Sequence, residues 1–298
     1  IKVQYPGVAE ALADDLDSTG VLRDLVGGDL GDSVSVDSLS ALRERLLAEL
    51  DYRAEAEHLR RFRRLFAHDR QVVIPDVIAD RSSGKVLTME RLCGRSLPEL
   101  SRDGSDEQRS QAGQTILRFA LECPLRHGVI NVDPNPGNYL ILDGNESVDE
   151  AKVGFLDFGC VAEIPEALQT ADRALYWAMI KRDGEALRYA AHQEGLIPSA
   201  SAFDNSTYRR WEKLLSAPFL EREAVRLTPE YVKELGELTW LLVQDRKMAL
   251  PPQTLLLWRQ RLGILAVVSS LRPALHFRAL LAKVLEDGHP IPMLQRYP

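Results

Sequence analysis

The segment from Asp133 to Gly159 constrains this chain more than any other. It contains Asp133 and Asn138, five positions apart, within the sequence Asp-Pro-Asn-Pro-Gly-Asn. Nineteen positions after Asn138 comes Asp157, the first residue of an Asp-Phe-Gly tripeptide. Carboxylate and amide oxygens are the hard donors that Mg²⁺ prefers, and two prolines and a glycine hold such a loop in shape before a ligand arrives. The segment therefore predicts a magnesium site with Asn138 and Asp157 as ligands.

The order of these residues also indicates a reaction. An Asp, an Asn five residues later and an Asp-Phe-Gly after a hairpin are together typical of phosphoryl transfer on a protein-kinase-like fold. In such a site Asp133 would orient the acceptor hydroxyl and take its proton. Each motif alone has another interpretation, since Asp-Pro, Asn-Pro and Pro-Gly are ordinary turn signals and a single Asp-Phe-Gly is common. Their occurrence in order between expected strands favours the chemical interpretation.

Two further charged groups complete the pattern. Lys2 lies on an expected strand, residues 1–4, where it would point away from its apolar neighbours, as a phosphate-contacting lysine does. Glu49, Asp51 and Glu55 lie in an expected helix, and the four-residue spacing predicts that Asp51 and Glu55 share one face. We expect a carboxylate of this helix to pair with Lys2. The alternative is a solvated lysine near a terminus and a solvated acidic face balanced by neighbouring arginines.

A linker is expected at Met89-Glu90-Arg91-Leu92, between an apolar strand and a turn at Gly94. In a two-lobed kinase-like fold this linker offers backbone groups to the edge of an adenine ring. We therefore predict that Met89, Glu90 and Leu92 bind nucleotide, through the main-chain oxygen of Glu90 and the main-chain nitrogen of Leu92.

The remaining patterns predict an α+β fold with two lobes. We expect a domain of residues 1–92 with the lysine strand, a long helix and the linker, and a domain of residues 93–298 with the catalytic loop and the C-terminal helices. The expected elements are a helix over 39–66, strands at 72–74 and 86–89, a polar stretch at 101–108, a helix to about 127 whose end Pro124 disturbs, strands at 139–142 and 151–156, and helices throughout after about 165.

Composition excludes several classes of protein. The chain has 298 residues, of which 45% are hydrophobic, enough for two folded lobes. Its net charge of −7 argues against nucleic acid as a partner, and three cysteines without Cys-x-x-Cys spacing argue against a zinc site. The most apolar run, Leu262–Leu271, is far shorter than the roughly 20 residues that span a bilayer. We expect a cytoplasmic protein whose membrane association, if any, is peripheral.

Several segments resemble the AarF/UbiB/ADCK family of atypical kinases. The resemblance covers roughly residues 1–165, and its most specific motifs are Lys-Val-Gln-x-Pro-Gly, Glu-x-Asp and Asp-Pro-x-Pro-Gly-Asn. The matching segments are Lys2–Val8, Glu49–Ala56, Val86–Leu97, Asp133–Asn138 and Asp157–Gly159.

The resemblance implies a kinase-like protein that binds Mg-ATP and acts as an ATPase or as a kinase of small molecules or lipids. It implies a role in the metabolism of ubiquinone and other isoprenoid quinones, with nucleotide and a lipid, quinone precursor or membrane surface as partners. Lys2 would contact the α and β phosphates with Glu55 as its helix partner, and Asp133 would be the catalytic acid of the loop. Asn138 and Asp157 would hold the metal.

The resemblance also implies a regulatory contact and shows departures. Glu49 and Asp51 would form the family's Glu-x-Asp pair, which meets an inhibitory Lys-x-Gly-Gln segment. That segment and an Ala-rich nucleotide loop lie upstream of the lysine in the family, so we expect an N-lobe truncated at its start. Two histidines of the family pattern are Asn131 and Asn135 here. Both can still hydrogen-bond, so the loop can be positioned, but proton chemistry through a histidine is lost.

Two other functions remain open from the sequence. A small-molecule phosphotransferase of the antibiotic-kinase type also uses an Asp and an Asn five apart, but the motifs at residues 3–7 and 49–51 disfavour it. A pseudokinase that serves as a scaffold is the second alternative. The presence of Asp133, Asn138 and Asp157 argues against it, because a scaffold does not need a complete set of metal-binding oxygens.

Overall fold

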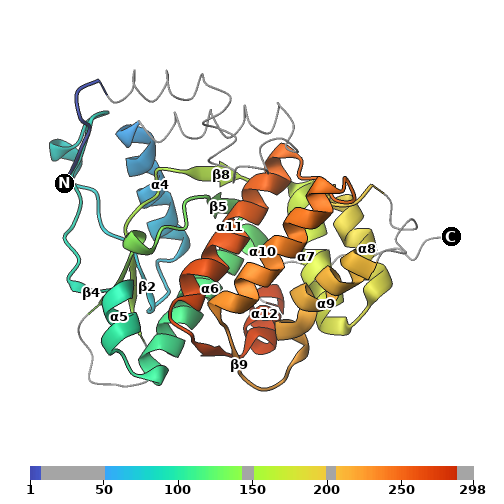
Figure 1. The fold of residues 1–298 in the computed structure, drawn as a ribbon. Coiled ribbons are helices and arrows are strands. Elements are labelled where there is room, and N and C mark those ends of the chain that lie inside the picture. The colour runs from blue at the N-terminus through green and yellow to red at the C-terminus, as the bar shows by residue number, and fades with distance from the viewer. Residues whose placement is uncertain (8–50, 143–150, 199–205, 287–298) are drawn as a thin grey trace.

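The computed structural model describes residues 1–7, 51–142, 151–198 and 206–286. Small strands and short helices lie on one side of the molecule, a long helix crosses its centre, and a group of helices forms the other side (Figure 1). The predicted α+β fold with a mostly helical C-terminal part is therefore confirmed. The division into domains at residue 92 stays a prediction.

The N-terminal elements are short strands around one helix. The two-residue strand β1 (Lys2–Val3) pairs antiparallel with β3 (Val86–Leu87), which places Lys2 opposite Leu87. The helix α4 (Tyr52–Leu65) begins at Tyr52 and not at 39 as expected, and residues 39–50 of that prediction lie outside the described residues. The strand β2 (Val72–Val73) follows it.

The start of α4 is fixed by a side-chain cap. Asp51 precedes the helix and its carboxylate accepts a hydrogen bond from the backbone N–H of Arg53 at 3.0 Å, which satisfies a donor that the first turn leaves unpaired. The expectation that Asp51 and Glu55 share one face of the helix is wrong, because Asp51 lies outside the helix as its cap. Glu55 lies in the first turn, on the buried stripe that continues through Leu59 and Phe62.

A four-stranded sheet joins the two halves of the chain. Its order is β2, β7 (Val153–Phe155), β6 (Tyr139–Leu142) and β4 (Gly94–Ser96). β2 runs parallel to β7, and the other neighbours are antiparallel. The strands predicted at 72–74 and 86–89 exist but belong to different sheets. Sequence pattern identifies a short strand, whereas its partner depends on the packing of distant segments.

A second pair of strands frames the predicted metal loop. The strand β5 (Val129–Asn131) pairs antiparallel with β8 (Val161–Glu163). The backbone N–H of Val132 extends this ladder by donating to the carbonyl of Cys160 at 2.8 Å. Between β5 and β6 the chain forms a short 3₁₀ helix, η3 (Pro136–Asn138). The pairing brings residues 131–133 beside residues 157–160.

Two helices meet within the polar stretch predicted at 101–108, and each begins with a capping box. The helix α5 (Leu97–Asp103) is capped by Ser96 and Glu99, and α6 (Asp106–His127) is capped by Ser105 and Gln108; in each pair the side chains and backbone N–H groups bond reciprocally. The polar stretch is therefore the end of α5, a short connection and the first turn of α6.

Pro124 lies inside α6, yet the helix continues to His127. Proline has no N–H, so it leaves the carbonyl of Ala120, four residues earlier, without its helical donor. The buried side chain of Gln260 donates to that carbonyl at 3.1 Å. A side chain from another helix thus replaces the missing bond, and the end of α6 stays ordered.

The C-terminal part consists of six helices in the described residues. They are α7 (Glu166–Lys181), α8 (Gly184–Gln193), α9 (Ser206–Leu220), α10 (Pro229–Gln244), α11 (Pro252–Ser269) and α12 (Phe277–Glu286). The expectation of helix throughout after 165 needs one correction. Two short strands, β9 (Val225–Arg226) and β10 (Ala274–Leu275), pair antiparallel and tie the segment before α10 to the segment before α12.

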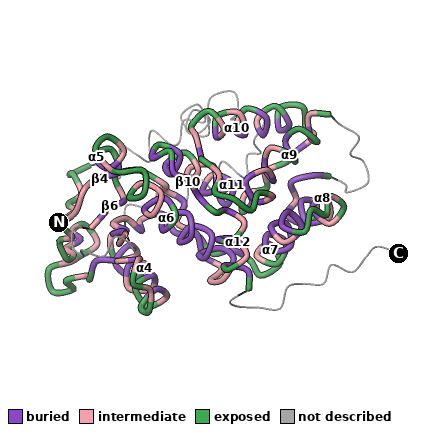
Figure 2. The backbone as a smooth tube through the Cα atoms, turned by 90° about the horizontal axis from the view of Figure 1, so that it is seen from below, coloured by how far each residue is buried: buried purple, intermediate pink, exposed green. Residues whose placement is uncertain are grey.

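The central helix α6 carries the core. Every residue from Thr115 to Leu125 is buried, so this helix is covered on all sides (Figure 2). One contiguous cluster of buried apolar side chains extends from α4 through α6 to α12. Phe119 of α6 stacks on Phe155 of β7 with ring centroids 4.0 Å apart and contacts Phe66 at 4.7 Å. Continuous packing of this kind fixes α4 and the sheet relative to the helical part.

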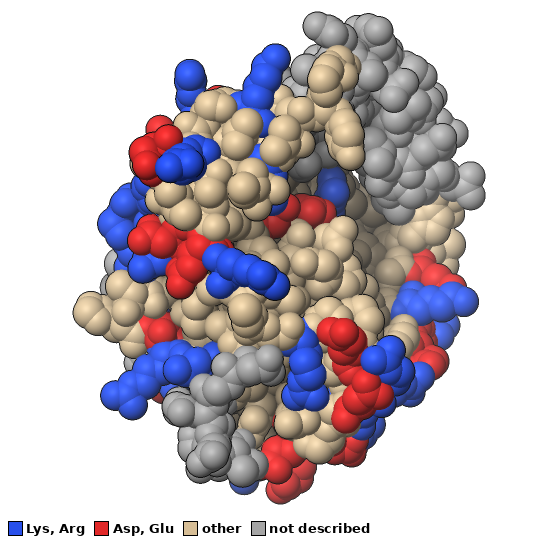
Figure 3. All heavy atoms as spheres, turned by 90° about the vertical axis from the view of Figure 1, so that its left-hand side faces the viewer, with Lys and Arg blue, Asp and Glu red and all other residues tan. Residues whose placement is uncertain are grey.

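The surface mixes charges of both signs. On the face that Figure 3 draws, basic and acidic groups are interspersed over the molecule. Some pair across elements, as Arg63 does with Asp76 and Glu90, at 3.7 Å in each case. Within the described residues, no helix combines the length and the hydropathy that a membrane span requires.

The contact between α11 and the predicted catalytic loop can be tested at a glycine. A Cβ atom added to Gly263 would lie 2.1 Å from Cγ of Pro134, so Gly263→Ala must displace the helix or the loop. Overpacking costs about 1–3 kcal/mol, more than the roughly 1 kcal/mol that alanine gains over glycine in a helix. We expect a lower free energy of unfolding in urea.

The matched control is Gly236→Ala in α10, where nothing lies within 4 Å of an added Cβ atom. There the same substitution is expected to raise the free energy of unfolding by about 0.5–1 kcal/mol. Equal effects of the two substitutions would show that the close approach of α11 to the loop does not constrain the protein.

Candidate active site

The side chain of Lys2 lies between two carboxylates from distant parts of the chain. Its Nζ atom is 2.5 Å from Oε1 of Glu55 in α4 and 2.7 Å from Oδ2 of Asp157, which follows β7. Glu55 is only 2% exposed. Three predicted site residues, separated by more than a hundred and fifty positions in the chain, therefore meet at one ammonium group.

The charges at this point oppose one another. Burial lowers the pKa of Lys2, but the negative charges of Asp157 and Glu55 outweigh burial and raise it above its usual value. Burial raises the pKa of Glu55, the charge of Asp157 raises it further, and Lys2 only partly opposes them. The charged carboxylate of Glu55 is therefore the destabilised member of this cluster, because burial removes its water and Asp157 places a like charge beside it.

The phenylalanine of the Asp-Phe-Gly motif locks α4 against the site. Phe158 is fully buried, with its ring 4.6 Å from that of Phe62. Its backbone N–H donates to Oε1 of Glu55 at 3.4 Å, and its carbonyl oxygen lies 2.9 Å from Nδ1 of His58. A carbonyl only accepts, so Nδ1 of His58 carries the proton in this contact. Sequence reasoning did not identify His58 or Phe62, because each is an ordinary residue of an amphipathic helix.

Asn131 links the loop that begins at Asp133 to the Asp-Phe-Gly segment through two hydrogen bonds. Its Nδ2 donates to the carbonyl oxygen of Asp157 at 2.7 Å, and its Oδ1 accepts from the backbone N–H of Asp133 at 3.3 Å. Asn135 makes a local turn, in which its Oδ1 accepts from the N–H of Gly137 at 2.9 Å. The two asparagines that replace histidines of the family pattern thus hydrogen-bond, as expected.

The amide of Asn138 is oriented by Asp133. Its Nδ2 donates to the carbonyl oxygen of Asp133 at 3.3 Å and to Oδ2 of the same residue at 3.2 Å. Both amide hydrogens are used, which leaves Oδ1 to accept a cation. The backbone N–H of Leu156 donates to the carbonyl of Asn138 at 3.0 Å and brings this residue beside Asp157.

These groups fit a magnesium ion that takes few protein ligands. The described residues contain no group of three or more His, Cys, Asp or Glu side chains placed to hold a metal. Mg²⁺ in nucleotide sites is bound by one or two carboxylates, substrate phosphates and water, so one carboxylate and one amide oxygen match that need. Oδ1 of Asp157 is oriented by the N–H of Gly159 at 3.0 Å.

The other predicted residues lie apart from this cluster. Asp51 is exposed and caps α4, and Glu49 lies outside the described residues, so the Glu-x-Asp pair stays a prediction. Met89 forms a bridge with Val77, and the backbone N–H of Glu90 donates to the carbonyl of Asp76 at 2.8 Å. These bonds hold the linker to the preceding segment. Its contact with a nucleotide, like that of the half-buried Leu92, stays a prediction.

Comparison with known proteins places the chain in a family. Residues 1–191 match the model of the ABC1 atypical kinase-like domain. The chain belongs to the ABC1 atypical kinase-like family. The family suggested by the sequence motifs is thereby confirmed, because the similar proteins include kinases of the COQ8 and ABC1K type.

Individual relatives are similar over different lengths. The chain is 33% identical over 191 residues to protein ACTIVITY OF BC1 COMPLEX KINASE 3, chloroplastic, of Arabidopsis thaliana, a match to 63% of this chain and 26% of that protein. It is 31% identical over 255 residues to atypical kinase COQ8B, mitochondrial, of Danio rerio, covering 77% of this chain and 39% of that protein. The chain thus spans well under half the length of these relatives.

A solved structure is similar over nearly the whole chain. It is the complex of Rv3197 with erythromycin, from Mycobacterium tuberculosis, with 25% sequence identity and a TM-score of 0.71. The superposition covers 95% of this chain and 70% of the other. The similarity therefore includes the helical part beyond residue 191, which the family model does not reach.

The balance of charges predicts a pH effect of Glu55→Gln. Folding raises the pKa of Glu55 above 4.5, so the folded state binds this proton more tightly than the unfolded state does. The protonated carboxyl therefore contributes to the free energy of unfolding at low pH. That contribution is lost as the pH rises from 4.5 through the raised pKa. The glutamine variant does not titrate there. We expect the free energy of unfolding of the wild type to fall relative to the variant as the pH rises from about 4 to about 7, measured by urea titration.

Glu57→Gln is the matched control, because Glu57 is exposed on the same helix. This control removes a carboxylate from the same helix but leaves the buried pair of Glu55 and Lys2 in place. If the difference between Glu55→Gln and the wild type changes with pH no more than that of Glu57→Gln, Glu55 is not the destabilised carboxylate.

Proposed function

We propose that this protein is a magnesium-dependent, ATP-binding atypical kinase or ATPase. The observation that supports this most directly is the ammonium group of Lys2 between Glu55 and Asp157. A lysine held by a buried helix glutamate is oriented toward nucleotide phosphates, and the aspartate beside it is placed for their metal ion. Family membership supports nucleotide binding in the same place.

In the proposed site Asn138 and Asp157 would hold Mg²⁺, which would supply positive charge to the phosphates of a bound nucleotide. Lys2 provides the positive charge beside Asp157 in this structure. With nucleotide and metal bound, Asp157 would face the metal cation and Lys2 would face the phosphates. Asp157 would thus exchange one cation for another, and Lys2 would exchange one anion for another. Neither charge would be left unpaired on binding.

Asp133 is the proposed general base. Its carboxylate accepts from Asn138 through Oδ2, and its backbone is fixed through Asn131. These bonds hold the carboxylate at the loop and leave Oδ1 to accept the proton of an acceptor hydroxyl. For hydrolysis the acceptor is water, and for transfer it is a small molecule or lipid. We infer from family membership that the acceptor belongs to isoprenoid-quinone metabolism.

The metal role of Asp157 predicts the effect of Asp157→Asn on nucleotide binding. The variant lacks the charge that attracts Mg²⁺, so Mg-ATP should no longer raise its melting temperature. In the wild type, nucleotide at a hundred times its dissociation constant stabilises the fold by about 2.7 kcal/mol. Asp80→Asn, the same change at an exposed turn, should retain the full shift. An unchanged shift in Asp157→Asn would contradict the metal role.

The proton-accepting role of Asp133 predicts a separation of binding from turnover. Asp133→Asn keeps a side chain of similar shape but cannot take a proton at neutral pH. We expect phosphate release from Mg-ATP to slow about 10²–10⁴-fold, while the Mg-ATP melting shift persists. Turnover close to that of the wild type would rule out general-base catalysis by Asp133. A wild-type chain with a melting shift but no turnover on any acceptor would favour the scaffold instead.

A further inference from the structure

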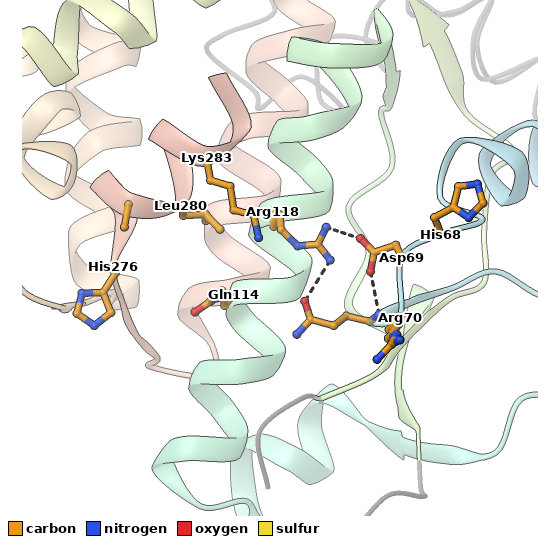
Figure 4. Close-up of a pocket in the computed structure, with 10 residues that line it drawn as sticks. His68, Asp69, Arg70, Gln114, Arg118, His276, Leu280 and Lys283 are labelled. Carbon is orange, nitrogen blue, oxygen red and sulfur yellow. Dashed lines mark hydrogen bonds and ion pairs between the residues drawn. The ribbon is translucent and has the colours of Figure 1, made fainter. Parts of the chain in front are cut away.

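A polar pocket of about 570 Å³ lies away from the Lys2 cluster. Three elements form it: the segment between α4 and β2, the middle of α6, and the first half of α12 (Figure 4). Its volume is in the range of pockets that hold small molecules. None of the residues predicted to bind nucleotide or metal lines it.

The floor of the pocket is a fixed network of charges. Arg118 of α6 is 9% exposed and forms an ion pair with Asp69. The same guanidinium donates to Glu122 at 3.1 Å and to the side chain of Gln71 at 3.3 Å. Arg126, two turns beyond Arg118 along α6, also pairs with Glu122 at 3.1 Å. Because these groups hold one another, the floor is preformed.

Among the described residues that line the pocket, Asp69 is the one carboxylate, and its charge is already compensated. Oδ1 of Asp69 accepts from the backbone N–H groups of Gln71 and Val72 at 2.8 and 3.1 Å, and Oδ2 faces Arg118. Burial raises the pKa of Asp69, but Arg118 and these N–H groups outweigh burial and lower it. Asp69 is therefore charged yet fully bonded, and it offers little repulsion to an incoming anion.

Two cations of the pocket have no such partner. Within the described part of the chain, neither Arg70 nor Lys283 forms an ion pair. They come from different elements: Arg70 from the segment before β2 and Lys283 from α12, whose side chain extends toward Arg118 in Figure 4. The rest of the lining consists of His68, Gln114, His276, Ala279 and Leu280. In Figure 4 the two cations lie on opposite sides of the paired Arg118 and Asp69, so a ligand that contacts both carries more than one negative charge.

We propose that this pocket binds a phosphate group, as a phosphomonoester or diphosphate, with Arg70 and Lys283 as its charged contacts. The pocket is larger than a phosphate needs, so the ligand carries a polar body that reaches Gln114. This site is separate from the proposed ATP site and does not depend on it. The phosphate belongs to a soluble metabolite or to a lipid headgroup, and the experiment separates the two.

The test is titration of the full chain with inorganic pyrophosphate in the presence of EDTA at low ionic strength, followed by ³¹P NMR line broadening. Charge-assisted contacts of this kind predict that Arg70→Glu and Lys283→Glu each weaken binding about tenfold or more. Lys213→Glu, the same charge reversal on the exposed face of α9, should bind as the wild type does. Lys2→Met should also bind normally, which separates this pocket from the ATP site.

Three outcomes would overturn the proposal: no binding by the wild type, equal weakening in Lys213→Glu, or loss in Lys2→Met alone. Sedimentation with phosphatidylcholine vesicles that contain phosphatidic acid identifies the source of the phosphate. Retention that Lys283→Glu abolishes and Lys213→Glu does not would assign the pocket to a lipid headgroup. Pyrophosphate binding without retention would assign it to a soluble metabolite.

Discussion

The structure depends on one ammonium group held between two carboxylates. Lys2 is the point at which β1, α4 and the segment after β7 meet, and each contributes one member of the cluster. Glu55 is buried and faces the like charge of Asp157, so it tolerates that position only with Lys2 beside it. The remaining packing serves to keep α4 and the Asp-Phe-Gly segment close enough for this arrangement.

Aromatic packing holds α4 against the Asp-Phe-Gly segment. Phe158 is the neighbour of Asp157 in the chain and packs on Phe62, two turns along α4 from Glu55. Phe119 of the buried helix α6 contacts Phe158 at 6.3 Å and stacks on Phe155. Residues 155–158 thus contribute both to the apolar cluster, through Phe155 and Phe158, and to the polar site, through Asp157. Movement of α4 would disturb both.

The sequence predicted the charged residues better than it predicted their surroundings. Lys2, Asp133, Asn138 and Asp157 were proposed because a metal-nucleotide site requires particular groups at particular spacings. The structure brings Lys2 beside Asp157 and Asn138 beside Asp133, and their binding roles stay predictions. The cap role of Asp51 was missed, because a carboxylate before a helix and one within its first turn look alike in a periodic pattern. The bond from Gln260 to the carbonyl of Ala120 could not be predicted, since the two residues are 140 positions apart and only packing brings them together. The parallel pairing of β2 with β7 has the same cause.

That pairing also connects the proposed phosphate pocket with the proposed ATP site. The segment with Asp69 and Arg70 follows α4, which carries Glu55, and precedes β2, whose partner β7 leads to Asp157. Asp69 holds the entry to β2 through two backbone N–H groups. An anion on Arg70 can influence the Lys2 cluster only if it binds two arrangements of this segment with different affinity. If it does, linkage requires that Mg-ATP change the affinity of the pocket by the same factor.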